Sequence, residues 1–158
     1  PVLLLILPLF LKRFGIKWTF AIGIVCWIAR YYIFSASAGM LVGGGTELNS
    51  VMPLLLAGVL LHGFSYDFVF ISGFLYVDQH VDEKVRAQAQ GLLTVFTQGI
   101  AFLISSQLFA GYYFTKVVTD TEMNDFSQWQ EYWLLPVAYL VVVLILFLFL
   151  FKDRKETV

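Results

Sequence analysis

The sequence predicts an all-α membrane protein with four full transmembrane spans and part of another. Hydrophobic residues make up 59% of the 158 residues and charged residues only 13%, against about 45–50% and about 25% in soluble domains. The apolar residues gather into runs that approach or exceed the roughly 20 residues a helix needs to cross a bilayer. Helix is the expected conformation, because an open sheet would leave unpaired backbone groups in lipid.

The apolar runs place the spans at 1–11 (partial), 18–35, 52–77, 88–114 and 133–151. No low-complexity linker separates them, and the loops are too short to hold a soluble domain. We therefore expect one transmembrane domain over residues 1–158. A signal peptide has basic residues before its apolar run, whereas here they follow it, so we expect the chain to start partway through a transmembrane helix.

Basic residues alternate between the two sides of the predicted membrane. The four loops and the tail carry, in order, three, none, two, one and three Lys or Arg residues. Cytoplasmic loops are enriched in these residues. We therefore expect segments 12–17 and 78–87 and the C-terminus in the cytoplasm, and the segments that contain Gly43–Gly45 and Asp120–Glu131 outside.

Asp67 is one of two charged residues that fall inside the predicted spans. It lies about 15 residues, or roughly 22 Å, from the outer start of its span, so its short side chain reaches neither surface. It must be neutral, paired or facing a polar cavity, because burial disfavours the charged form. A carboxyl that gains and loses a proton as its exposure alternates would serve a proton-coupled carrier. The alternative is a structural Asp that caps a broken helix or bonds a neighbouring one.

Arg30 is the other charged residue inside a span, and it lies about six residues, or roughly 9 Å, from the predicted outer end. A long Arg side chain can extend to the surface over that distance. We expect either this arrangement or a structural ion pair. The estimated difference in depth from Asp67, about 13 Å, does not imply a direct salt bridge between them.

The stretch 62–73 (HGFSYDFVFISG) is unusually rich in polar and aromatic residues for the middle of a span. His62 and Tyr66 are four residues apart and therefore share a helix face. Rings beside hydrogen-bonding groups suit a planar polar ligand such as a nucleobase. Alternatively, His62 bonds a neighbouring helix and most of Phe64, Phe68 and Phe70 face lipid. The two histidines are too far apart in depth for a metal site, and none is expected.

The predicted span 88–114 carries a polar stripe at three- and four-residue spacing. The stripe is formed by Gln90, Thr94, Thr97 or Gln98, Ala101 and Ser105. Small residues accompany it: Ala87, Gly91, Gly99 and Gly111. Such residues usually let helices approach closely and bond across the interface, and we rank that interpretation above ligand contact. The sequence contains no Walker A, GxSxG, HExxH or glycine-rich dinucleotide motif. Cys26 is the only cysteine, so no CxxC pair is available to bind a metal. For these reasons neither an enzymatic nor a metal centre is predicted.

Several stretches resemble one transporter family. The basic loop 11–17 (LKRFGIK) and the stretch 85–91 (VRAQAQG) resemble cytoplasmic segments of the major facilitator superfamily. The stretches 27–31 (WIARY), 66–68 (YDF) and 71–73 (ISG), with the RAQAQG stretch downstream, resemble the bacterial nucleoside:proton symporters more narrowly. The matching stretches keep their order across nearly the whole chain.

The resemblance implies the C-terminal helical bundle of a twelve-helix carrier in the bacterial inner membrane, with residues 1–11 in helix 8 and the full spans as helices 9 to 12. It implies that Asp67 couples substrate to the proton and that His62, Tyr66 and Asp67 face the substrate. His62 departs from the aromatic residue expected at its position. The implied partners are a nucleoside, the lipid bilayer and the missing N-terminal half, without nucleic acid and without a cofactor beyond the coupling proton.

Two other functions fit the sequence less well. One is a major facilitator carrier for another small polar solute, such as a sugar. The other is a membrane scaffold or receptor that transports nothing, in which Asp67 and Arg30 serve only helix packing. The carboxylate in the middle of a span, with rings beside it, and the two cytoplasmic segments that resemble the superfamily favour a proton-driven secondary transporter over a scaffold or receptor.

Overall fold

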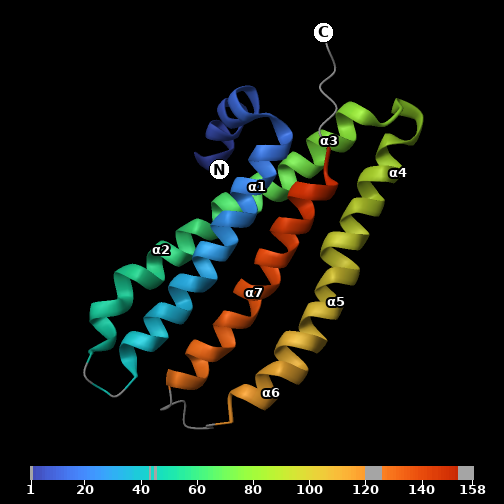
Figure 1. The fold of residues 1–158 in the computed structure, drawn as a ribbon. Coiled ribbons are helices and arrows are strands. Elements are labelled where there is room, and N and C mark those ends of the chain that lie inside the picture. The colour runs from blue at the N-terminus through green and yellow to red at the C-terminus, as the bar shows by residue number, and fades with distance from the viewer. Residues whose placement is uncertain (1, 43, 45, 120–125, 153–158) are drawn as a thin grey trace.

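The computed structural model describes residues 2–42, 44, 46–119 and 126–152. These residues contain no strand and form four long helical rods (Figure 1). Each rod is long and apolar enough to cross a membrane, which confirms the predicted all-α membrane fold. In chain order, with η marking π-helical segments, the elements are α1 (Val2–Leu41), α2 (Leu48–Tyr66), η1 (Asp67–Ile71), α3 (Ser72–His80), α4 (Glu83–Thr94), η2 (Val95–Ile100), α5 (Ala101–Ser105), η3 (Ser106–Tyr113), α6 (Phe114–Val117) and α7 (Phe126–Leu150).

A sharp break at Gly15 divides α1 into two helices. The backbone of Gly15 has φ 75° and ψ 175°, a conformation that essentially only glycine adopts. The hydroxyl of Thr19 donates to the Gly15 carbonyl at 2.8 Å. The short first helix folds back at the end of the bundle where α3 meets α4 (Figure 1). Gly15 therefore separates the partial span from the first full one.

Replacing Gly15 by Ala will destabilise the protein by about 1–3 kcal/mol, because the added Cβ is incompatible with this backbone conformation. Thermal unfolding of the purified full-length protein will measure the loss. Gly15→Asn should not restore stability, because Asn tolerates the left-handed helical region and ψ here lies far outside it. A Gly15→Ala protein that unfolds at the wild-type temperature would show that the break does not require glycine.

The helices extend beyond the apolar runs that predicted them. α1 continues to Leu41, and the second rod covers Leu48–His80 rather than 52–77. Hydrogen bonding carries a helix past the point at which its residues stop being apolar, so hydropathy underestimates its length. As a consequence Arg30 lies about 16 Å from the end of its helix at 1.5 Å per residue, whereas it lies about 9 Å from the end of the predicted span.

α1 is the centre of the packing, with α2 and η1 on one side and α7 on the other. Small residues allow these close approaches, as expected for helices in lipid. Gly23 faces η1, Gly58 of α2 faces Phe34, and Gly39 faces Gln130 of α7. The hydroxyl of Ser35 also donates to the Gln130 carbonyl at 2.9 Å. The third rod, α4 to α6, makes its close backbone contacts with the other rods near its two ends.

Segments 12–17 and 78–87, predicted to be cytoplasmic, lie at one end of the bundle together with the C-terminal end of α7 (Figure 1). Lys17 donates to the Leu148 carbonyl near the end of α7 at 2.8 Å, and the Tyr76 ring lies 5.3 Å from that of Phe151. Among the residues of the loops and tail, Gly43, Gly45, 120–125 and 153–158 lie outside the described part of the chain.

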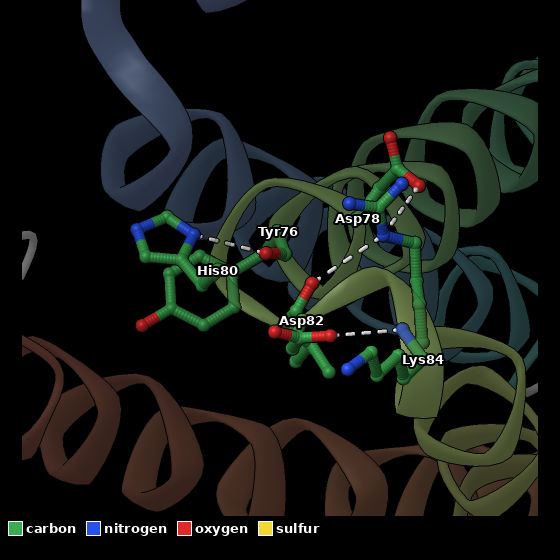
Figure 2. A network of polar contacts seen from close by, with 7 residues as sticks. Tyr76, Asp78, His80, Asp82 and Lys84 are labelled. Atoms are coloured by element: carbon green, nitrogen blue, oxygen red, sulfur yellow. Dashed lines mark hydrogen bonds and ion pairs between the residues drawn. The ribbon is translucent and has the colours of Figure 1, made fainter.

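The hairpin between α3 and α4 is held by local polar contacts (Figure 2). The Asp82 carboxylate accepts from the Lys84 backbone N–H at 2.9 Å and so caps the first turn of α4. Arg86 Nε lies 3.4 Å from Asp78 Oδ1 and 3.4 Å from the Val81 carbonyl. His80 Nδ1 lies 2.9 Å from the Tyr76 carbonyl. The ion pair is solvent-exposed and contributes about 0–1 kcal/mol, so its main effect is to set the geometry of the turn.

Candidate functional site

Three rings form a ladder along one face of the second rod. His62 and Tyr66 have ring centroids 6.3 Å apart, and Tyr66 and Phe70 have centroids 4.7 Å apart. The ladder follows from the four-residue spacing of these residues, which places them on one helix face. Trp27 of α1 extends it, because its ring meets that of Phe70 edge-on at 5.9 Å. We call His62, Tyr66 and Phe70 the aromatic ladder.

Phe64 and Phe68 belong to a different face of the same rod. Phe68 is completely buried, and its ring contacts Phe64 at 5.9 Å and Phe10 at 5.0 Å. The expectation that most of the three phenylalanines face lipid is therefore wrong for Phe68, which packs against α1. It is also wrong for Phe70, which belongs to the aromatic ladder.

A cavity of about 750 Å³ lies between two rings of the aromatic ladder, Tyr66 and Phe70, and the third rod, and His62 is not one of its lining residues. Tyr66 and Phe70 line one wall, and Thr97, Gln98 and Ser105 of the third rod supply polar groups on another. Phe109 and Tyr139 add further rings. Ligand sites are typically concave spaces of about 300–1,000 Å³ with mostly apolar walls and a few polar groups, and this cavity has both properties.

Asp67 is the first residue of η1, directly after Tyr66. Its carboxylate is half-buried and has no hydrogen-bond or ion-pair partner among the described residues. It is not one of the residues that line the 750 Å³ cavity. It lies about 29 Å from one end of its rod and about 20 Å from the other at 1.5 Å per residue. Single π-helical turns within α-helices are frequent at functional sites, and Asp67 begins one.

Arg30 and His62 are joined directly. Arg30 Nη1 lies 2.9 Å from His62 Nδ1, and the guanidinium lies over the rings of Tyr31 and Phe34, 5.3 Å from each centroid. Within the part of the chain described, Arg30 makes no ion pair with Asp67. The bond agrees with the alternative that His62 bonds a neighbouring helix. The sequence did not identify Arg30 as the partner, because no pattern along the chain relates the register of α1 to that of α2.

In the described part of the chain, the hydroxyls of the third rod's polar stripe bond within their own rod and not across helices as expected. The hydroxyls of Thr94, Thr97 and Ser105 donate to carbonyls of their own rod at 3.0, 2.7 and 3.0 Å. A Cβ placed on Gly91 or Gly99 would meet nothing within 4 Å. The stripe therefore borders open space in this structure, and Thr97 and Ser105 are at the cavity wall.

Sequence reasoning missed four rings of the cavity wall, those of Phe70, Phe102, Phe109 and Tyr139. Phe70 entered the sequence analysis only in the alternative that most of three phenylalanines face lipid, although its four-residue spacing from Tyr66 could have placed it on the ladder. Tyr139 lies in α7, where it is the one polar side chain within an otherwise apolar run, 137–151. Such an isolated tyrosine in a span is the signal that could have identified it.

The fold and the site together define a multi-pass α-helical membrane protein with a ring-lined cavity between its spans and an unpaired carboxylate beside it. The family described as Nucleoside H+ symporter matches residues 2–156, and the chain belongs to this family. The match confirms the family that the sequence resembles.

The relatives of the chain are named as nucleoside transporters. It is 33% identical to the nucleoside permease NupG of Escherichia coli (strain K12) over 155 residues, which is 98% of the chain and 34% of NupG. It is 32% identical to the xanthosine permease of the same organism, over 97% of the chain and 34% of that protein. A crystal structure of a mutant of the nucleoside transporter NupG superimposes with a TM-score of 0.70 and 32% identity, over 96% of this chain and 34% of that one. The chain thus spans about a third of the length of these relatives.

Proposed function

We propose that this chain forms the C-terminal part of a twelve-helix carrier that takes up nucleosides together with protons by alternating access. Residues 1–158 would form one transmembrane domain, and the N-terminal half of the carrier would close the other side of the cavity. In such carriers the substrate binds near the middle of the bilayer, between the two halves. We place the carrier in the bacterial inner membrane because its relatives are permeases of Escherichia coli. We place its C-terminus in the cytoplasm because Lys and Arg residues are concentrated in segments 12–17 and 78–87 and in the tail.

The observation that carries the proposal is the aromatic ladder at a cavity wall, next to a carboxylate in the middle of a span. Tyr66 and Phe70 offer ring faces on which a planar base can stack, and Thr97, Gln98 and Ser105 lie among the other lining residues. Asp67 directly follows Tyr66 and would carry the proton. An ionisable residue inside a membrane is costly to maintain and is by default a candidate for function. His62 would extend the substrate wall at the end of the ladder.

The proposal is tested by uptake of labelled uridine into vesicles that contain the full-length transporter. We expect uridine to accumulate against its gradient when the outside is acidic, and to equilibrate without accumulating when a protonophore removes the pH difference. Accumulation that is independent of the pH difference would reject proton coupling. A well-folded transporter that takes up no nucleoside would reject the substrate class.

Replacing Tyr66 by Leu will raise the KM for uridine about tenfold, because loss of a stacked base is worth about 1–3 kcal/mol. Initial rates of uptake at increasing uridine concentration will measure the change. Tyr32→Leu is the matched control: Tyr32 is exposed on α1 and does not line the cavity, so its KM should stay at the wild-type value. Equal changes in both variants would mean that Tyr66 does not contact the base.

A further inference from the structure

Arg30 is a cation within an apolar rod, and its only hydrogen-bonded partner among the described residues is a histidine. Its Nη1 lies 2.9 Å from His62 Nδ1. Its Nε is buried and has no hydrogen-bond partner in the described part of the chain. The rings of Tyr31 and Phe34 cover the guanidinium and hold it by cation–π attraction. The side chain is therefore fixed from several sides in a position that aims one N–H at the imidazole.

This bond determines where His62 carries its proton. A guanidinium has only donors and stays protonated at all physiological pH values. His62 Nδ1 must therefore accept, which requires a neutral imidazole with its hydrogen on Nε2. A second proton on the ring would replace the acceptor with a donor and place two cations in contact. While this bond is made, the hydrogen that His62 can donate is therefore the one on Nε2.

The donor stands at the end of the aromatic ladder. His62 is exposed, and its ring neighbours Tyr66, which lines the 750 Å³ cavity. A planar ligand stacked on Tyr66 or Phe70 presents the edge of its ring, where the acceptors of a nucleobase lie. A site that donates to such an acceptor strongly rejects analogues that lack it, because its own polar group would be left unpaired.

We propose that Arg30 is a positioning residue that fixes His62 as a neutral Nε2–H donor, and that this donor selects ligands with a carbonyl acceptor on a planar ring. The statement that His62 selects ligands rests on the proposed nucleoside transport. The statement that Arg30 positions His62 does not, and a spectroscopic measurement tests it separately.

The first experiment reads the tautomer of His62 from the nitrogen-15 NMR spectrum of the full-length protein with labelled histidine, with His62→Phe used to assign the signals. In the wild type we expect an unprotonated Nδ1 and a protonated Nε2. Arg30→Leu should give a mixture of the two tautomers, whereas Arg30→Lys, which keeps a cation and donors, should stay closer to the wild type. A wild-type proton on Nδ1, or a spectrum that Arg30→Leu leaves unchanged, would overturn the assignment.

The second experiment measures uptake of uridine and of its 2-thio and 4-thio analogues, in which a weak sulfur acceptor replaces one carbonyl oxygen. The wild type should discriminate against at least one analogue, and Arg30→Leu and His62→Phe should each lose that discrimination and raise the KM for uridine about tenfold. Because Arg30 acts through His62, the double variant should be no worse than His62→Phe alone.

The outcomes separate the two proposals. If the increases in KM of the two single variants multiply in the double variant, the selection by His62 is rejected while nucleoside transport stands. The same holds if the wild type takes up the thio analogues as well as uridine. A wild type that transports no nucleoside rejects the proposed function and the selection of ligands by His62. In that case the tautomer spectrum alone decides the role of Arg30.

Discussion

The variant Asp67→Asn will lose uphill accumulation of nucleosides and reach only equal concentrations on the two sides of the membrane. For one proton per nucleoside, a pH difference of one unit supports about a tenfold accumulation, because a tenfold ratio corresponds to about 1.4 kcal/mol. Asn has nearly the shape of a protonated Asp but cannot release a proton. The inside-to-outside ratio of uridine should therefore fall from about ten in the wild type to about one.

Exchange of uridine across the membrane should survive in Asp67→Asn. Exchange needs only the loaded carrier to change its exposure, and a neutral side chain at this position imitates the protonated, loaded state. Counterflow of labelled against unlabelled uridine, without a pH difference, will measure it. Retained exchange with lost accumulation separates a coupling residue from one required for folding.

Asp78→Asn is the matched control for Asp67→Asn. Asp78 is a carboxylate on the same rod but is solvent-exposed and paired with Arg86 at 3.4 Å. An exposed ion pair of this kind contributes about 0–1 kcal/mol, so accumulation should stay near the wild-type level. Accumulation driven by the pH difference in Asp67→Asn would remove Asp67 from the coupling mechanism.

The sequence was sufficient to predict that the rods exist, but not how they meet. Apolar runs predict helices in lipid because a helix pairs its own backbone N–H and C=O groups, whereas an open sheet would leave some of them unpaired. The same runs contain little information on helix register, since nearly every face is apolar. The bond between Arg30 and His62 depends on that register, so the sequence could leave open a structural partner for Arg30 but could not identify it.

The candidate site shows the same division between local and long-range information. The shared face of His62 and Tyr66 is a local consequence of four-residue spacing, and the structure contains the ladder that this spacing implies. Phe68 could not be assigned in the same way. Its burial depends on Phe10, which a break at Gly15 returns to the bundle, and on Gly23, which lets α1 approach. Both glycines are about 45 or more residues from Phe68 in the sequence, and hydrophobic periodicity predicts only which residues of one helix share a face.

Gly23→Ala will destabilise the protein by about 1–3 kcal/mol, the usual effect of adding a methyl group to a filled core. A Cβ at this position would lie 2.8 Å from Val69 Cγ2, 3.0 Å from Phe68 Cβ and 3.2 Å from the Val69 backbone nitrogen. Two of these atoms are not the ends of flexible side chains, so relief requires α1 and η1 to separate. Since η1 begins at Asp67, the displacement should also lower uridine uptake.

Gly73→Ala provides the comparison, because Gly73 lies on the same rod in a less crowded place. Its added Cβ would lie 3.4 Å from a ring atom of Phe20 and 3.5 Å from Leu93 Cδ2, which are ordinary contact distances. Thermal unfolding of the two full-length variants should therefore show a clear loss for Gly23→Ala and little change for Gly73→Ala. If both unfold at the same temperature, the close approach at Gly23 does not limit the packing of η1. Without that limit, the position of Asp67 must be set by other contacts of the second rod.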